Sequence, residues 1–283
     1  MMTWRKLEKQ FERISFIRKL SIWWADRRAM AWHQRNPGKP FSDYYVDQVR
    51  DHLARGRPHP TLGNQGFTDE VGSRIEWDRA NFAERGRYAW QGYRRAGVQS
   101  GMRCVDYGCG SLRVGQHAIR FLEAGNYWGI DVTESFIDEG RELIDPELLA
   151  AKRPRLSVID DGLIDLIGVW EPHFIFSHAV LQHVPQAELV TYFDRLARMM
   201  GPGCRAAIEF IAAPATTRIK AMSWGYADEA LRAAAATIDP ALVIWFETVP
   251  CDDSVIMRKP RHIMILERPA ETAAMAQGIR LAS

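Results

Sequence analysis

Hydrophobic and polar residues along the middle of the chain follow the order strand, helix, strand. Short apolar runs at residues 104–106 and 127–130 predict two strands. Between them, apolar residues recur at helical spacing from Val114 to Leu122, so we expect a helix that lays one face on a sheet. Gly125 ends this helix. The stretch 103–132 therefore predicts one βαβ unit.

The same alternation continues to residue 269 and predicts an α/β protein. Further strands are expected at residues 156–159, 174–176, 206–211, 242–249 and 262–266. Further helices are expected from Thr133, which can cap the first of them, and at residues 163–170, 185–200 and 226–238. Pro146 is expected to interrupt the helix that Thr133 begins.

The first third of the chain has a different pattern. Residues 3–32 carry apolar side chains at steps of three and four, which predicts one long amphipathic helix. Its stripe is Trp4, Leu7, Phe11, Ile14, Ile17, Leu20 and Trp24, with Trp23 beside it. A turn-rich joint follows at residues 36–40, and residues 84–95 predict a helix ahead of the first strand.

Composition excludes several classes of protein. The 283 residues are 47% hydrophobic and 25% charged, as in ordinary globular proteins, and a net charge of +2 argues against a nucleic-acid partner held by bulk charge. The four cysteines form no Cys-x-x-Cys pair, so neither a metal site nor a disulfide framework is expected. Charges interrupt the N-terminal apolar residues too often for a signal peptide, and we expect a cytoplasmic protein.

Candidate chemistry gathers where the first two strands of the βαβ unit end. Gly108 and Gly110 allow a tight turn into the helix, and Asp131 stands at the end of the second strand, 21 residues after Gly110. This arrangement places backbone N–H groups and a carboxylate around one crevice, where the carboxylate can bind the hydroxyls of a ribose. A nicotinamide site would need a third glycine where Arg113 stands, and Asp106 would repel a diphosphate.

Asp106-x-Gly108-x-Gly110 with Asp131 resembles the cofactor signature of class I S-adenosylmethionine (SAM)-dependent methyltransferases. This resemblance implies a Rossmann-like seven-stranded, mostly parallel sheet with helices on both faces and strand order 3-2-1-4-5-7-6, the last strand antiparallel. It also implies a catalytic domain at residues 99–269, preceded by an N-terminal helical extension (1–98) and followed by a tail (270–283). The sequence departs from the signature at Leu112, where many members have a third glycine.

The resemblance implies SAM as the cofactor and S-adenosylhomocysteine (SAH) as its product. The residues it implies for the cofactor are Asp106, Gly108, Cys109, Gly110, Asp131, Val132, Asp160, Asp161 and Ser177. Asp160 and Asp161 follow the third strand, and they compete for the adenine amino group while either can cap the next helix.

Methyl transfer to a hydroxyl also needs a base that removes its proton. His178 and His183 follow the fourth strand, near the expected position of the methyl group, and are the candidate catalytic residues. A structural role in the loop is the alternative for each, and Glu209 on the fifth strand is a further candidate.

The methyl acceptor is the open question. Enzymes that methylate nucleobase nitrogens resemble one another in an Asp/Asn-Pro-Pro-aromatic run after the fourth strand, which Ser177-His178-Ala179-Val180 does not match. A small molecule, a sugar or a lipid-linked glycan, methylated on oxygen, is therefore expected. Two other classes stay open, namely a nicotinamide-dependent oxidoreductase and a non-catalytic protein with the SAM-binding fold.

The N-terminal helix adds a further expectation. Residues 1–35 hold nine basic and three acidic side chains, a local balance of +6. Basic residues with tryptophan on one amphipathic helix are typical of segments that lie in a membrane interface. Peripheral contact of residues 3–32 with the inner face of a membrane is one interpretation. Packing on a second subunit in a homodimer, or on the chain's own domain, is the other.

Overall fold

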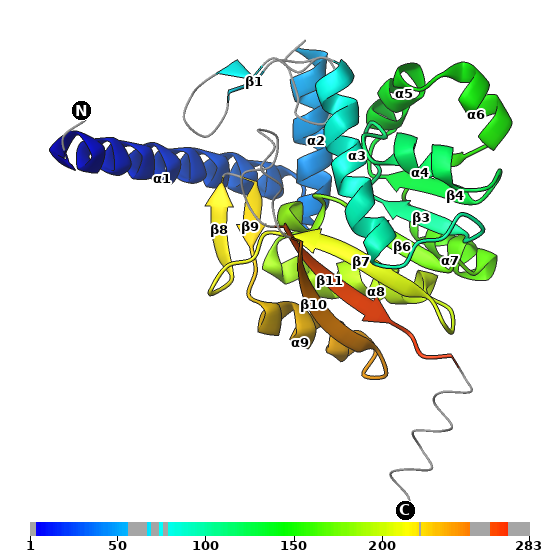
Figure 1. Cartoon of the computed structure of the whole chain (residues 1–283). Coiled ribbons are helices and arrows are strands. Elements are labelled where there is room, and N and C mark those ends of the chain that lie inside the picture. Colours follow the sequence, from blue (N-terminus) through cyan, green and yellow to red (C-terminus); the bar gives the residue numbers. More distant parts are fainter. Residues whose placement is uncertain are drawn as a thin grey trace, which may run out of the picture.

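A computed structural model describes residues 4–55, 67–68, 74–75, 79–220, 222–249 and 261–270 (Figure 1). Most of the expected C-terminal tail, beyond Ala270, lies outside the described residues, as do the side chains of residues 1–18. In the described part, no helix is long and apolar enough to cross a membrane.

One seven-stranded sheet forms the centre of the protein, in the order β10-β11-β7-β6-β3-β4-β5. Its strands are β3 (Cys104–Tyr107), β4 (Tyr127–Asp131), β5 (Arg155–Val158), β6 (Phe174–Ser177), β7 (Arg205–Phe210), β10 (Val243–Val249) and β11 (Arg261–Glu267). Neighbouring strands from β5 to β7 are parallel, whereas β11 runs antiparallel to both of its neighbours. Counted along the chain, this is the predicted order 3-2-1-4-5-7-6, so the predicted fold is confirmed.

Helices cover both faces of the sheet because successive strand residues point to opposite sides. Val105 and Ile175 belong to one buried cluster with helices α7 (Asp161–Trp170), α8 (Leu189–Met199) and α9 (Asp228–Ile238). Cys104, Phe174 and Phe176 belong to the other, with helices α3 (Arg79–Arg95), α4 (Gly115–Phe121) and α5 (Glu134–Leu143). The sheet is therefore buried on both faces, as a parallel sheet requires.

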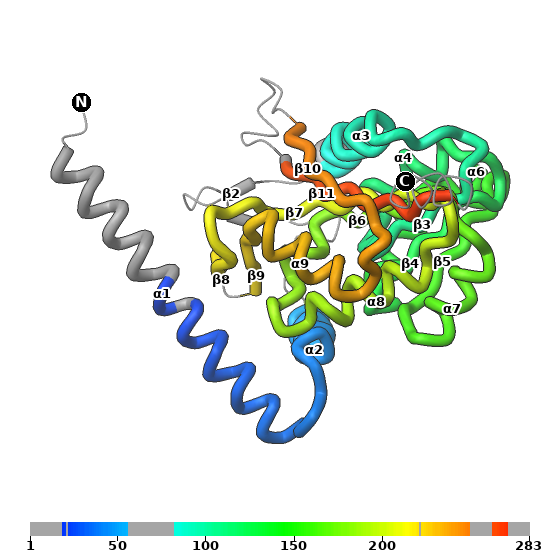
Figure 2. Tube along the Cα trace, turned by 90° about the horizontal axis from the view of Figure 1, so that it is seen from below, coloured from blue at the N-terminus to red at the C-terminus, as the bar shows by residue number. Residues whose placement is uncertain are grey.

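An N-terminal arm, residues 4–54, precedes this domain, and α2 with the C-terminal part of α1 lies against one end of it (Figures 1 and 2). It consists of α1 (Trp4–Arg35), the joint at residues 36–40 and α2 (Phe41–Ala54). The C-terminal part of α1 contacts a small hairpin of β8 (Thr217–Lys220) and β9 (Ser223–Gly225), where Asp26 pairs with Arg218.

Several local elements differ from the prediction. The sequence pattern missed α2, the β8–β9 hairpin, a two-stranded pair of β1 (Phe67–Thr68) and β2 (Arg74–Ile75), and helix α6 (Pro146–Lys152). Pro146 does more than interrupt a helix: it occupies the first turn of α6, and Asp145 caps that helix. The residues before α8 form two short 3₁₀ turns, η1 (Leu181–His183) and η2 (Gln186–Glu188). Thr133 is the N-cap residue of α5, as predicted, but its side chain makes no capping hydrogen bond.

The turn after β3 is fixed to the neighbouring strand by backbone hydrogen bonds. The N–H groups of Gly108 and Cys109 both donate to the carbonyl of Ile130 on β4, at 2.8 and 3.0 Å. Gly108 has φ +85°, and a Cβ atom there would lie 2.2 Å from Cγ2 of Val180 in the loop after β6. The turn therefore requires glycine at position 108 for its conformation and for the close approach of this loop.

We predict that Gly108→Ala destabilises the fold more than Gly125→Ala does. Gly125 has nearly the same φ, +81°, but no atom lies within 4 Å of its would-be Cβ, so this control carries the backbone strain alone, about 1 kcal/mol. The clash with Val180 adds roughly 1–3 kcal/mol at Gly108. Urea denaturation measures both variants.

Adding Val180→Ala to Gly108→Ala should restore part of the loss, because it removes the clashing atom. Equal free energies of unfolding for the Gly108 and Gly125 variants would contradict this account of the turn.

Candidate functional site

A cavity of about 320 Å³ opens at the carboxyl ends of β3, β4 and β6. The turn from Gly108 to Gly110 forms its floor together with Asp106 and Asp131. The loop after β6 forms another wall, and α2 adds Ser42 and Tyr45. The strand order of this sheet reverses between β3 and β6. In an open parallel sheet, ligands bind at the carboxyl edge beside such a reversal.

Asp131 connects the end of β4 to the glycine turn. One of its oxygens accepts a hydrogen bond from the N–H of Gly110 at 2.8 Å, and the other accepts from the N–H of Thr133 at 3.3 Å. Burial nevertheless raises the pKa of Asp131 to about 6, because the three backbone N–H groups around it, those of Gly110, Thr133 and Val132, only partly replace water.

Asp106 is the second buried carboxyl on the cavity wall, with 1% of its surface exposed. The hydroxyl of Tyr127 donates to it at 2.7 Å. Burial raises the pKa of Asp106 to about 7; the hydrogen bond from Tyr127 opposes this rise, and the charge of Asp131 adds to it.

These two carboxyl groups are suited to a ligand with a positive charge and hydroxyl groups. Within the described ranges, neither of them forms an ion pair with an arginine, lysine or histidine. A buried carboxylate without a cationic partner is costly, so a ligand that brings its own ammonium group would lower that cost. No group of three or more His, Cys, Asp or Glu side chains among the described residues could hold a metal ion.

The other predicted cofactor residues divide into two sets. Cys109 and Val132 line the cavity beside the carboxyl groups. Ser177 does not: its hydroxyl is buried, donates to the carbonyl of Tyr107 at 2.8 Å and accepts from the hydroxyl of Tyr192 at 3.0 Å. Ser177 thus joins the ends of β3 and β6 to α8, behind the cavity wall.

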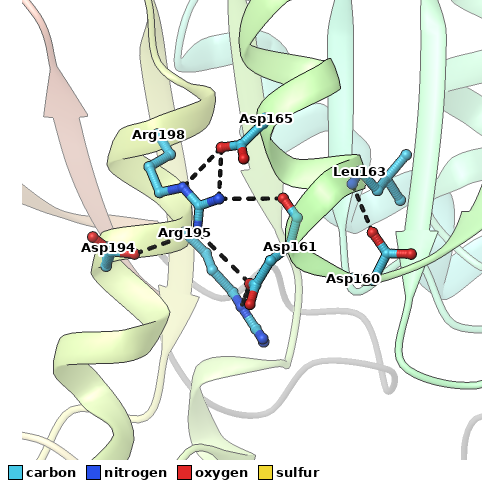
Figure 3. A network of polar contacts seen from close by, with 7 residues as sticks. All are labelled: Asp160, Asp161, Leu163, Asp165, Asp194, Arg195 and Arg198. Atoms are coloured by element: carbon cyan, nitrogen blue, oxygen red, sulfur yellow. Dashed lines mark hydrogen bonds and ion pairs between the residues drawn. The ribbon is translucent and has the colours of Figure 1, made fainter.

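Asp160 and Asp161 lie outside the cavity, whereas their neighbour Ile159 lines it. Asp160 caps α7 by accepting from the N–H of Leu163 at 2.7 Å (Figure 3). Asp161 pairs with Arg195 at 3.2 Å and Arg198 at 3.7 Å, in a network that ties α7 to α8. Recognition of adenine by either aspartate stays a prediction.

His178 stands on the cavity wall directly after β6. Its Nδ1 atom is in close contact with the carboxylate of Glu209 on β7, and both side chains are largely buried. The hydroxyl of Tyr93, on α3, lies 3.4 Å from the same nitrogen and donates to the carbonyl of Ser177 at 3.1 Å. The histidine is therefore oriented by a carboxylate on the adjacent strand.

His183 lines the same cavity, but both of its ring nitrogens have partners. Nδ1 lies 2.7 Å from the carbonyl oxygen of Met222, which can only accept, so Nδ1 carries the proton. Nε2 lies 3.1 Å from the side-chain nitrogen of Gln182 and accepts from it. Burial lowers the pKa of His183, which keeps the imidazole neutral. The hydrogen bond from Nδ1 to Met222 holds the loop after β6 to the β8–β9 hairpin.

Sequence reasoning missed the residues that α2 and the turn before α8 bring to the cavity. Glu188 lines the cavity and accepts hydrogen bonds from the first N–H groups of α2, those of Phe41 and Ser42. Tyr45, one turn further along α2, contacts the ring of His183, with ring centroids 5.3 Å apart and the planes tilted by 35°. Only a tertiary contact reveals this cap, because Pro40 at the N-cap position itself offers none.

No protein-family model matches this sequence, and no curated protein sequence matches it. Among solved structures, the magnesium protoporphyrin IX methyltransferase of Synechocystis PCC 6803 with bound SAH is similar, with a TM-score of 0.53 and 16% identity over 80% of this chain and 97% of that one. A SAM-dependent methyltransferase of Methanosarcina mazei has a TM-score of 0.48 and 13% identity, over 63% of this chain and 98% of that one. Mitomycin 7-O-methyltransferase has a TM-score of 0.47 and 16% identity, over 67% and 54%.

The strand order and the first of these likenesses define the fold. The chain has the class I SAM-dependent methyltransferase fold, as the resemblance predicted.

The pKa of Asp106 predicts how stability depends on pH. Between about pH 4 and pH 7 the native carboxyl retains its proton, while the same group in the unfolded chain, with a pKa of 3.8, has released it. The free energy of unfolding therefore falls as pH rises through this window, at about 1.4 kcal/mol per pH unit for one such group.

Asp106→Asn should reduce this decline, because asparagine still accepts from Tyr127 but does not titrate. Urea denaturation of both proteins from pH 4.5 to pH 7.5 measures the difference. Parallel curves for the two proteins would show that Asp106 is ionised throughout.

Proposed function

We propose that this protein is a methyltransferase that uses SAM and releases SAH. The observation that carries the proposal is the pair of buried carboxyl groups, Asp106 and Asp131, beside the glycine turn at the reversal point of a methyltransferase-type sheet. When bound, SAM supplies an electrophilic methyl group on a sulfonium that leaves as a neutral thioether.

The cavity residues have distinct roles in holding the cofactor. Asp131 binds the ribose hydroxyls, because it stands at the end of β4 and its orientation is fixed by Gly110 and Thr133. Asp106 faces the ammonium group of the methionine end, and Cys109 and Val132 form the surrounding wall. Recognition of the adenine amino group is assigned to Asp160 or Asp161, and Ser177 supports the wall from behind.

We further propose that the acceptor atom is an oxygen and that His178 is the general base. The Nδ1 atom of His178 faces Glu209, so Nε2 is the ring nitrogen that receives the hydroxyl proton as the oxygen forms its bond to the methyl carbon. Glu209 positions the ring and stabilises the imidazolium that results, with Tyr93 beside them. His183, whose nitrogens are engaged by Met222 and Gln182, positions the loop.

The acceptor class and cellular setting complete the proposal. Tyr45, Val180 and Tyr192 give the cavity an apolar and aromatic wall, which suits a small molecule, a sugar or the head of a lipid-linked glycan. We place the enzyme in the cytoplasm, with residues 3–32 in contact with the inner face of a membrane. A homodimer through the same segment is the competing arrangement.

Two alternatives from the sequence are less favoured. A nicotinamide-dependent oxidoreductase is opposed by Arg113, which lines the cavity at the position of the third glycine, and by the buried carboxyl of Asp106. A non-catalytic protein with this fold is opposed by His178, which lines the cavity and is oriented by Glu209 behind it, an arrangement that packing alone does not need.

We predict that His178→Ala lowers the turnover of labelled SAM by about a hundredfold or more, the usual contribution of a general base. Its affinity for SAM, measured by calorimetry, should remain unchanged. His173→Ala is the matched control. His173 lies directly before the start of β6, at the end of the strand away from the cavity, so this variant should keep full turnover. Cell fractions split into polysaccharide, lipid and small-molecule pools supply the acceptor.

Glu209→Gln separates orientation from structural support. Loss of the carboxylate destabilises the imidazolium, so the acid limb of the pH–rate profile should move to lower pH while the variant remains folded.

Unchanged turnover of the His178 variant would remove this histidine from the mechanism.

A further inference from the structure

Helix α1 is attached to the domain by a narrow face of two alanines and one tryptophan. Ala25, Ala29 and Trp32 are buried, at steps of four and three residues, and Trp32 donates through Nε1 to Asp47 of α2 at 2.9 Å. Asp26 contacts Arg218 of the β8–β9 hairpin. These contacts fix which side of α1 faces the protein.

The opposite side of the same helix is apolar and exposed. At 3.6 residues per turn, Leu20, Trp23, Trp24, Arg27 and Met30 point away from the buried face. Their exposed fractions are large for apolar side chains: 43% for Leu20, 46% for Trp23, 52% for Trp24 and 61% for Met30. We call these five residues the outer face of α1.

The two indole rings on this face contact each other and a neighbouring arginine. Trp23 and Trp24 meet edge to face with centroids 4.9 Å apart, and the guanidinium of Arg27 lies 4.8 Å from the Trp23 ring. Two exposed indoles are not needed to hold α1 on the domain, because the buried face already does so. A contiguous exposed apolar surface with a charged rim marks an interaction site.

Charge identifies the partner. From Lys19 to Arg35 the exposed charged side chains, Lys19, Arg27, Arg28 and Arg35, are all positive, while the acid in this stretch, Asp26, is paired with Arg218. The nine basic against three acidic residues of positions 1–35 extend the same sign along the helix. Indoles and cations together suit the headgroup region of an anionic bilayer, where tryptophan lies at the interface and each lysine or arginine is attracted by the negative surface potential.

We propose that the outer face of α1 is a docking surface for an anionic membrane and that it brings the catalytic cavity to the bilayer. α1 continues through residues 36–40 into α2, whose Ser42 and Tyr45 line the cavity and whose first N–H groups bond to Glu188. Docking helix and cavity wall are thus one continuous arm. The inference rests on the proposed methyl transfer. Because the arm brings the cavity to the bilayer, it favours a lipid-linked acceptor over a freely soluble one.

The test is co-sedimentation of the full-length protein with vesicles of phosphatidylcholine alone or with added phosphatidylglycerol. The wild-type protein should bind the anionic vesicles, and Trp23→Ala/Trp24→Ala should weaken that binding by about tenfold or more, since each indole loses a buried apolar surface. Leu166→Ala/Val169→Ala, which removes two exposed apolar side chains from α7, is the matched control and should bind as the wild type does.

The outcomes distinguish the docking surface from its rivals. Loss of vesicle binding in the tryptophan variant with unchanged SAM affinity supports the proposal. Equal binding of wild type and tryptophan variant, or a wild-type dimer that the tryptophan variant converts to a monomer in sedimentation analysis without any vesicle binding, overturns it. SAM affinity is measured separately by calorimetry, so failure of the proposed cofactor leaves the vesicle result interpretable.

Discussion

The site depends on the hydrogen bonds that join the glycine turn to β4. The carbonyl of Ile130 accepts from Gly108 and Cys109, and the carboxylate of Asp131 accepts from Gly110, so three successive N–H groups of the turn are held by two successive residues of one strand. Burying the carboxylate of Asp131 costs free energy, and the raised pKa of this group reflects that cost. The hydrogen bonds keep a turn with two left-handed glycines, Gly108 and Gly110, fixed at the sheet edge beside the cavity.

Around this turn the protein builds its chemistry from segments far apart in the sequence. The loop after β6 supplies His178, and β7 supplies Glu209 to orient it. The N-terminal arm adds the remaining wall, held by two hydrogen bonds from the start of α2 to Glu188 and by the packing of Val49 on Phe136 of α5. In the proposed function the glycine turn holds the cofactor and α2 encloses the acceptor, so the arm would be part of the site as well as a connection to a surface.

Much of the fold and half of the site could be predicted because they follow from local patterns. The strands and helices of the domain, the glycine turn and the carboxyl groups of Asp106 and Asp131 each leave a periodic or spaced signal, whereas the strand order followed from the resemblance that these residues carry. Glu188, Ser42 and Tyr45 leave none, since α2 is capped across 146 or 147 residues by a side chain of another element. Leu112 shows the reverse: a leucine where the signature has glycine adopts a left-handed φ of +60° and is fully buried in the core. Residues next to Ser177, Asp160 and Asp161 in the sequence line the cavity, but these three side chains contact other partners. The sequence does not show this difference, because it depends on the direction of each side chain.

Calorimetric titration of the purified protein with SAM, and in parallel with NADH, tests the central claim most directly. The account predicts one SAM bound per chain, no heat from NADH, and loss of SAM binding in Asp131→Ala with the fold intact by circular dichroism. Absence of SAM binding by the wild-type protein, or NADH binding that SAM displaces, would contradict it.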